Sequence, residues 1–174
     1  KTKAIICGNQ FGHSCDFDEI RNLVKEKDVC VVEDNAEALG GKYKNKINGS
    51  HGDFATLSFF ANKAITTGEG GALITNSETI ANRARMIRDH GMNPDKKYDF
   101  LELGVNYRMT NMQAAVGVGQ MRRLDEILLR RKHCAEKFDE AFLGVQGITV
   151  RQTSQWCHQG HWLYTVFLEN NSLR

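Results

Sequence analysis

The sequence lacks several features that would narrow its function at once. It has one proline, Pro94, in 174 residues, where an average usage of about 5% would give roughly nine. No apolar run approaches the ~18–20 residues that cross a bilayer. The first apolar run, Ala-Ile-Ile-Cys (4–7), is too short for a signal peptide. We therefore expect neither a transmembrane segment nor a membrane partner.

The chain also lacks an excess of charge of either sign. Lysine and arginine number 23 and aspartate and glutamate 21, which gives a formal net charge of +2. This balance provides no general electrostatic reason to bind nucleic acid or anionic lipid. Hydrophobic residues at 41% and charged residues at 25% exclude wholesale disorder and are typical of a globular domain.

Paired cysteine motifs are absent. The five cysteines are scattered and odd in number, and no two form a Cys-x-x-Cys pair. A disulfide framework or a zinc ribbon is therefore not expected. We expect a reducing, cytoplasmic location. Cys157, His158 and His161 form the one metal-like cluster. Because a structural zinc site needs four ligands, we interpret them as polar residues near the start of a strand and expect no metal.

The N-terminal third predicts a βαβ unit. The apolar run at 4–7 and a second one at 29–32 indicate short strands, the second buried on both sides. Between them, Asp16 and Glu19 resemble a capping box that opens a helix over 17–27. Ile20, Leu23 and Val24 recur at helical spacing and predict its core face. The two strands should be parallel, with a right-handed crossover.

The rest of the chain alternates between strands and helices. Glycines in residues 38–52 predict hairpin turns, and strands are expected over 54–60, 71–75 and 162–168. One helix should begin after Ser77 and end before Gly91. A longer one should begin after Thr110, in a capping box, and continue to Gly144. Gly117 and Gly119 predict a break or close packing within it.

The first candidate for chemistry is Asp34, in Val-Val-Glu-Asp-Asn-Ala-Glu (31–37). It directly follows a buried parallel strand, where open α/β sheets place their ligands. A carboxylate in that position must be solvated, paired with a cation or hydrogen-bonded to a protonated group. Taken alone, Asp34 is more typical of a helix cap or a loop.

The second candidate is Lys63, which follows Ser-Phe-Phe-Ala-Asn (58–62) and precedes Thr-Thr-Gly-Glu-Gly-Gly (66–71). A loop between two strands can partly desolvate an ammonium group, so that the neutral amine can attack a carbonyl. By itself Lys63 is more typical of an exposed loop lysine. The glycines match neither a Walker A loop nor a dinucleotide fingerprint and by themselves indicate a tight turn.

Together these residues suit pyridoxal 5′-phosphate (PLP). That cofactor needs a lysine for its Schiff base and an acid partner on its pyridine nitrogen, so that the ring can act as an electron sink. It also needs donors for its phosphate. Lys63 and Asp34 provide the first two groups, and the hydroxyl of Ser58 could provide a phosphate donor.

Several motifs in order along the chain resemble the StrS/DegT-type sugar-nucleotide aminotransferases, and within them the GDP-perosamine synthase group. The motifs are Glu-Asp-Asn-Ala-Glu-Ala (33–38), Gly-Asp-Phe-Ala-Thr-Leu-Ser-Phe-Phe-Ala-Asn-Lys (52–63), Thr-Thr-Gly-Glu-Gly-Gly (66–71), Gly-Val-Asn-Tyr-Arg-Met-Thr-Asn (104–111) and Gln-Ala-Ala (113–115). The sequence departs from the family at Gly-Asn-Gln-Phe-Gly (8–12), where relatives usually have Val-His-Leu-Tyr-Gly.

The resemblance implies a role for each matching residue. Lys63 would form the Schiff base and shuttle the proton, and Asp34 would pair with the pyridinium nitrogen. Glu37, where many relatives carry glutamine, would lie against the ring or its hydroxyl. Ser58 would bind the phosphate, and Asn106 would reach the phosphate of a neighbouring subunit, which makes a homodimer part of the active site.

The resemblance also implies a fold. It is α/β, the large domain of an aspartate aminotransferase-like, fold type I PLP-dependent transferase with a mainly parallel sheet, followed by the start of a smaller α+β domain. We expect residues 1–122 to belong to the large domain and residues 123–174 to form a connecting helix and the start of the small one. The chain begins without methionine and stops in Glu-Asn-Asn-Ser-Leu-Arg, so we expect the central portion of a longer enzyme, inactive alone.

The leading hypothesis for function is transfer of an amino group from glutamate to a nucleotide-linked keto-sugar, a 4-keto-6-deoxyhexose, in lipopolysaccharide or glycan biosynthesis. A PLP-dependent sugar dehydratase is the first alternative, although that branch usually carries histidine at the position of Lys63. A non-catalytic fragment or regulator that keeps the fold is the second.

Three further features have less specific interpretations. The basic pair at 122–123 and the basic triplet at 130–132 are interleaved with acidic residues and indicate a solvated helix face. Trp156, Trp162 and Tyr164 are typical of core or interface aromatics. Arg108 could contact substrate or pair with a carboxylate.

Overall fold

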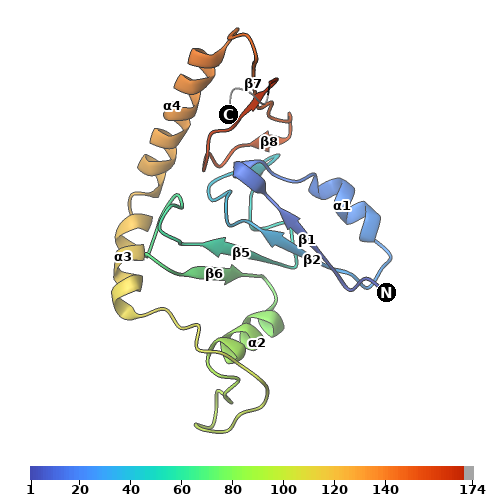
Figure 1. Cartoon of the computed structure of the whole chain (residues 1–174). Helices are drawn as coiled ribbons and strands as arrows, with labels where there is room; N and C mark the ends of the chain where they lie inside the picture. The colour runs from blue at the N-terminus through green and yellow to red at the C-terminus, as the bar shows by residue number, and fades with distance from the viewer. Residues whose placement is uncertain (171–174) are drawn as a thin grey trace.

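A computed structural model describes residues 1–170 of the chain, and its elements follow one another around a four-stranded sheet (Figure 1). The sheet has the strand order β1-β2-β5-β6. Its strands are β1 (Ala4–Gly8), β2 (Cys30–Asp34), β5 (Phe54–Ser58) and β6 (Gly71–Ile74). β1, β2 and β5 are parallel and β6 is antiparallel to β5, so the sheet is mainly parallel, as predicted.

The predicted βαβ unit is confirmed. Helix α1 (Phe17–Val24) connects β1 to β2, and Ala4 to Gly8 pair in parallel with Cys30 to Asp34. Asp16 caps the helix, because its carboxylate accepts a hydrogen bond of 3.2 Å from the amide of Glu19. The helix ends at Val24, three residues earlier than predicted, and a turn leads into β2.

The core lies between α1 and one face of the sheet. Phe17, Val24 and Val31 are buried there, with Ile20 packed against them. Leu23 was expected in this core but is 66% exposed, because it lies at the edge of the arc that Phe17, Ile20 and Val24 share on the helix. The second strand was expected to be buried on both sides, but in β2 Val31 is fully buried whereas Val32, on the other face, is only half-buried. On that same face Ile6 of β1 is 72% exposed.

The strand predicted over 54–60 ends at Ser58, because the chain then turns. The amide of Phe60 donates to the hydroxyl of Ser58, and the carbonyl of Phe59 accepts from the amide of Thr67. The glycine-rich loop therefore folds back over the end of β5 and leads into β6. The hairpin predicted within 38–52 is present as β3 (Lys42–Tyr43) and β4 (Lys46–Ile47), and β8 (Cys157–His158) adds to it.

The helices begin where their caps predict. Ser77 caps α2 (Glu78–Arg88), and Thr110 and Gln113 form the full capping box of α3 (Asn111–Met121). The long stretch breaks after Met121, not at the glycines, and continues as α4 (Leu124–Phe142). Gly117 serves close packing instead, since a Cβ there would lie 3.0 Å from Thr67. None of the helices in residues 1–170 is long and apolar enough to cross a membrane.

The last predicted strand is shorter than expected. Only Val166–Leu168 form a strand, β9, which pairs with β7 (Ile148–Val150). The preceding residues from Trp162 to Thr165 are not in a strand but line a cavity beside α4. The polypeptide therefore returns, at its C-terminal end, to the neighbourhood of α4 (Figure 1).

The core contact of Phe17 gives a first test. Phe17 is 2% exposed, so replacement by alanine should lower the free energy of unfolding by about 3–5 kcal/mol. The matched control is Leu23→Ala on the same helix, which should change it by less than about 1 kcal/mol. Urea denaturation followed by circular dichroism measures both, and equal losses would contradict this description of the core.

Candidate active site at the carboxyl edge of the sheet

The connections that follow three parallel strands lie side by side along one edge of the sheet. The amide of Asn9, after β1, donates to the carbonyl of Asp34 at 3.0 Å, and the amide of Asn35, after β2, donates to the carbonyl of Thr56 on β5 at the same distance. Open α/β sheets bind ligands at this edge. The predicted site residues are therefore placed by backbone pairing.

Asp34 and Ser58 stand at the ends of neighbouring strands. Asp34 pairs in register with Thr56, which puts Ser58 two residues further along the same edge. The Oδ1 atom of Asp34 accepts hydrogen bonds from the Ala36 amide at 3.1 Å and the Thr56 hydroxyl at 3.3 Å. These two bonds fix the carboxylate at the end of β2.

Lys63 lies on the loop between β5 and β6, five residues after Ser58. Its amide donates to the carbonyl of Phe60 at 3.0 Å, which forms a turn, and its side chain is half-buried. The amine Nζ lies 3.7 Å from the centre of the Trp162 ring. The lysine is thus covered by an aromatic side chain from the C-terminal part of the chain.

Glu37 contacts the segment whose sequence departs from the family. Its Oε2 accepts a hydrogen bond of 2.8 Å from the amide of Phe11, in the short 3-10 helix η1 (Gln10–Gly12). Phe11 has a φ of 51°, a left-handed conformation that is uncommon for an aromatic residue. In this structure Glu37 therefore helps to hold a strained backbone position beside the site.

Glu33 was not singled out from the sequence, although it is fully buried. Its Oε1 accepts from the side-chain amide of Asn9 at 2.9 Å and the amide of Gly49 at 2.6 Å, and its Oε2 accepts from the amide of His51 at 3.0 Å. The only signal in the sequence was an acidic residue inside an apolar strand. Glu33 ties the residue after β1 and the loop after β4 to the strand that ends in Asp34.

Asn106 is exposed on the segment between α2 and α3, which extends away from the sheet (Figure 1). Its Oδ1 accepts from the guanidinium of Arg108 at 3.2 Å, and Arg108 also forms an ion pair of 3.1 Å with Asp89. Arg108 therefore pairs with a carboxylate, one of the two predicted alternatives. Within one chain, Asp34, Ser58 and Lys63 share one sheet edge, whereas Asn106 lies on a separate segment.

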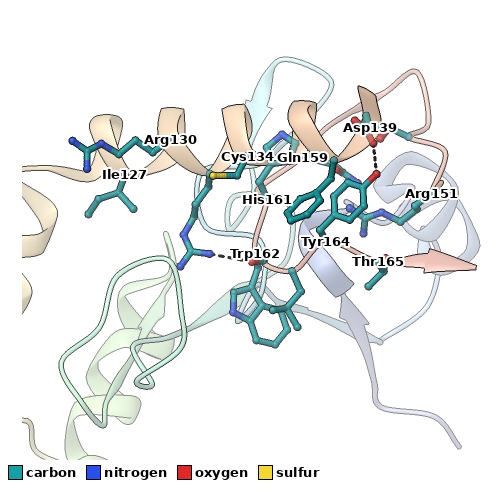
Figure 2. Close-up of a pocket in the computed structure, with 15 residues that line it drawn as sticks. Ile127, Arg130, Cys134, Asp139, Arg151, Gln159, His161, Trp162, Tyr164 and Thr165 are labelled. Atoms are coloured by element: carbon teal, nitrogen blue, oxygen red, sulfur yellow. Dashed lines mark hydrogen bonds between the residues drawn. The ribbon is translucent and has the colours of Figure 1, made fainter. Parts of the chain in front are cut away.

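A cavity of about 420 Å³ separates α4 from residues 151–165 (Figure 2). The hydroxyl of Tyr164 donates to Asp139 at 2.7 Å, and burial together with this carboxylate raises the pKa of Tyr164 to about 12. Burial lowers the pKa of His161, and the nearby Arg151 adds to that effect. Trp162, which was predicted to be a core or interface aromatic, lines this cavity together with Tyr164.

Arg131 corrects the prediction of a solvated basic face on α4. Its neighbour Arg130 is exposed and pairs with Glu126 on the same helix, as predicted. Arg131 is half-buried, and its guanidinium donates to the carbonyls of Trp162 at 3.0 Å and Lys63 at 3.1 Å. No local pattern distinguishes these two arginines, because the distinction depends on contacts with residues 31 and 68 positions away.

Cys157, His158 and His161, which are close in sequence, have different surroundings: Cys157 is buried, His158 is exposed and His161 is half-buried. The sulfur of Cys157 accepts a hydrogen bond of 3.2 Å from the amide of Ser14. Within residues 1–170, no group of three or more histidine, cysteine, aspartate or glutamate side chains is arranged to hold a metal ion.

The residues at the sheet edge fit PLP. The set combines a primary amine on Lys63, a carboxylate on Asp34 for a protonated ring nitrogen, and a hydroxyl on Ser58 beside the backbone turn that follows β5. These are the groups that the aldehyde, the pyridine nitrogen and the phosphate of this cofactor require. Their common position at the carboxyl ends of parallel strands is also that of a ligand site.

The sequence and the fold both match known proteins. A GDP-perosamine synthase of Caulobacter vibrioides is 42% identical over 170 residues, which are 97% of this chain and 46% of the relative. The solved structure of S. venezuelae DesV has a TM-score of 0.91 at 32% identity, over 99% of this chain and 46% of that chain. The chain spans about half the length of these relatives.

The likeness in fold extends to a dehydratase. E. coli GDP-4-keto-6-deoxy-D-mannose-3-dehydratase, solved with bound hydrated PLP, has a TM-score of 0.88 at 28% identity and covers 98% of this chain and 48% of that chain. The fold class is therefore the mixed α/β architecture of PLP-dependent transferases, as predicted. The family model for the DegT/DnrJ/EryC1/StrS aminotransferase family matches residues 1–173. The chain belongs to this family, whose cofactor is PLP.

The buried carboxylate of Glu33 provides a test of how the edge is held. Glu33→Gln replaces an acceptor by an amide group that faces N–H donors, so we expect the free energy of unfolding to fall by about 1–3 kcal/mol. Glu140→Gln, at an exposed pair with Lys137, is the control and should cost less than about 1 kcal/mol. Urea denaturation measures both, and no loss for Glu33→Gln would show that its hydrogen bonds are dispensable.

Proposed function

We propose that the chain carries the lysine-bearing part of an aminotransferase that uses PLP to aminate a nucleotide-linked keto-sugar. The observation that carries the proposal is Lys63, on a loop at the sheet edge where Asp34 and Ser58 stand on neighbouring strands. Family membership and the similarity to a GDP-perosamine synthase support it. The fold alone does not separate this activity from dehydration, since it is shared with a dehydratase; the lysine at position 63 favours amination.

Each residue has a proposed task. Lys63 would hold PLP through its amine and, when free of the cofactor, would move a proton as a base. Asp34 would hold a proton on the ring nitrogen, so that bound PLP would supply an electron sink. Ser58 donates to the phosphate. Glu37 holds Phe11 through the bond described above, and we propose that its carboxylate also borders the ring.

The proposed substrates balance as a transamination. Glutamate gives up its amino group and leaves as 2-oxoglutarate, and the keto-sugar exchanges its ketone oxygen for that amine. A nucleotide-linked 4-keto-6-deoxyhexose is the proposed acceptor, with the product used in lipopolysaccharide or glycan synthesis. The similarity to GDP-perosamine synthase supports this class of acceptor.

We also propose that the chain spans two domains. Residues 1–122 contain the four-stranded sheet and α1 to α3, and the second part begins with α4 and continues through β7 and β9. The break between α3 and α4 after Met121 supports a boundary there. The last four residues of the second part lie outside the described residues. A reducing, cytoplasmic location is supported by the cysteines, since all five are free.

A homodimer is proposed because Asn106 stands apart from the Lys63 site of its own chain. The segment around it exposes large apolar side chains, among them Tyr98, Leu103 and Tyr107. Exposed groups of this kind mark surfaces that bind other proteins. In a dimer whose second subunit covers this segment, Asn106 would contact the phosphate group of the PLP bound to that second subunit.

Borohydride reduction tests the role of Lys63. The test uses the complete enzyme that contains these residues, loaded with PLP. Borohydride reduction should leave a phosphopyridoxyl group on Lys63, which peptide mass spectrometry identifies. Lys63→Ala should abolish both this group and the release of 2-oxoglutarate. Lys96→Ala, at an exposed loop lysine, should change neither. A phosphopyridoxyl group at another lysine would overturn the assignment, and cofactor-loaded protein without turnover would favour the non-catalytic alternative.

Mixed dimers test the role of Asn106. Lys63→Ala and Asn106→Ala should each inactivate the enzyme when pure. After the two are denatured together and refolded, about a quarter of wild-type activity should return, because half of the dimers are mixed and each mixed dimer has one intact site. The recovered activity is measured as 2-oxoglutarate release. If none returns, while refolded wild type recovers fully, Asn106 does not serve a neighbouring subunit.

A further inference from the structure

The backbone around Lys63 is held by a residue of α4. The guanidinium of Arg131 donates through one nitrogen to the carbonyl of Lys63 at 3.1 Å and through the other to the carbonyl of Trp162 at 3.0 Å. A guanidinium suits this task because its donors lie in one rigid plane, whereas a lysine ammonium is a flexible point charge. Arg131 therefore joins the loop after β5 to the segment before β9.

Trp162 completes the contact from the other side. Its indole Nε1 donates to the carbonyl of Asn62 at 3.0 Å, and its ring centre lies 3.7 Å from the amine of Lys63. A cation over an indole ring is attracted by the ring's negative face. Asn62 and Lys63 are thus held at two backbone carbonyls and at the amine itself.

Trp162 is in turn fixed from the segment after β1. Its ring stacks on Phe11, with 6.3 Å between ring centres and 13° between planes. The strained Phe11 backbone is held at both ends, because its amide donates to Glu37 and its carbonyl accepts from Arg151 at 3.0 Å. A strained position persists only where its surroundings determine it.

We propose that Arg131 and Trp162 are positioning residues for Lys63, and we call the two together the lysine brace. The inference rests on the proposed function of Lys63. A lysine side chain has many conformations, and each time an incoming amine releases it from the cofactor it must stay close enough to move a proton. Arg131 holds the loop and so keeps the free amine within reach as a base, and the indole ring holds the ammonium form while it carries the proton to its next position.

Chemical labelling tests the indole contact without any turnover. With the cofactor removed from the full chain, acetic anhydride should acetylate Lys63 about two- to fivefold faster in Trp162→Leu than in wild type. The measure is the rate at Lys63 divided by that at Lys137, an exposed lysine of α4, which removes differences in reagent between samples. Circular dichroism must show that each variant is folded, because unfolding would raise the rate at Lys63 and leave that at the exposed Lys137 unchanged. Trp162→Phe keeps a ring but removes the Nε1 donor, and its ratio should stay near the wild-type value.

The labelling outcomes decide between roles. An unchanged ratio in folded Trp162→Leu overturns the proposed contact. Equal rises in Trp162→Leu and Trp162→Phe would assign the effect to the hydrogen bond with Asn62 and overturn the role of the ring. If Trp162→Leu does not fold, the ratio in Trp162→Phe still tests the role of the ring, because a rise there would contradict it. The arginine variants below test the role of Arg131. Because this readout needs no aminotransfer, it remains valid if the proposed reaction is wrong.

Steady-state kinetics of the holoenzyme test the arginine. Arg131→Lys keeps the charge but cannot bridge two carbonyls in a plane, so kcat should fall about 10- to 100-fold while KM changes less than about threefold. Arg130→Lys, one residue away and paired with Glu126, should leave both values within about twofold. A loss in Arg131→Lys that lies in KM alone, or equal effects of the two variants, would overturn the positioning role.

Discussion

The buried carboxylate of Glu33 holds together the edge on which the candidate site is built. An unpaired charge in that position would be strongly destabilising, but its oxygens accept three N–H groups from Asn9, Gly49 and His51. Asn9 lies directly after β1, whereas Gly49 and His51 lie in the loop after β4. One carboxylate therefore fixes the residue after β1 and the loop after β4 to the end of strand β2, and the geometry of the neighbouring residues follows from that arrangement.

Two adjacent acidic residues have different tasks because side chains alternate along a strand. Glu33 points into the protein and is fully buried, whereas Asp34, at the end of the same strand, is held by Ala36 and Thr56 at the sheet edge. The alternation therefore places the structural carboxylate and the candidate site carboxylate on opposite faces of the same strand. A one-residue shift in the register of β2 would turn Glu33 out of the interior and move Asp34 from the position that it now holds at the sheet edge.

The local elements could be predicted from the sequence because their signals are local. The caps at Asp16, Ser77 and Thr110, and the parallel pairing of β1 with β2, depend on residues a few positions apart or on one crossover. Asp34 was found because it stands at the end of a buried strand, Lys63 because it lies on a loop between two strands, and Ser58 because its hydroxyl precedes that lysine by five residues. Their meeting at one edge follows from the general rule for parallel sheets.

The rest depended on contacts that no local pattern contains. Arg131 and Arg130 are indistinguishable in a run of basic residues, and only the return of the chain at Trp162 makes one of them half-buried. Leu23 matched the helical period but lies beyond the arc that the sheet covers. The short β9 likewise reflects the cavity beside α4, since residues 162–165 contact side chains there instead of a partner strand.

The lysine brace also sets the order in which the site can form as the chain is made. The loop that carries Lys63 is synthesised well before its partners, which follow 68 and 100 residues later. The strands β1, β2 and β5 can pair from nearer contacts, but contacts that close such long loops bear a larger entropic cost and form late. The amine of Lys63 is therefore positioned only after the sheet beneath it is already in place.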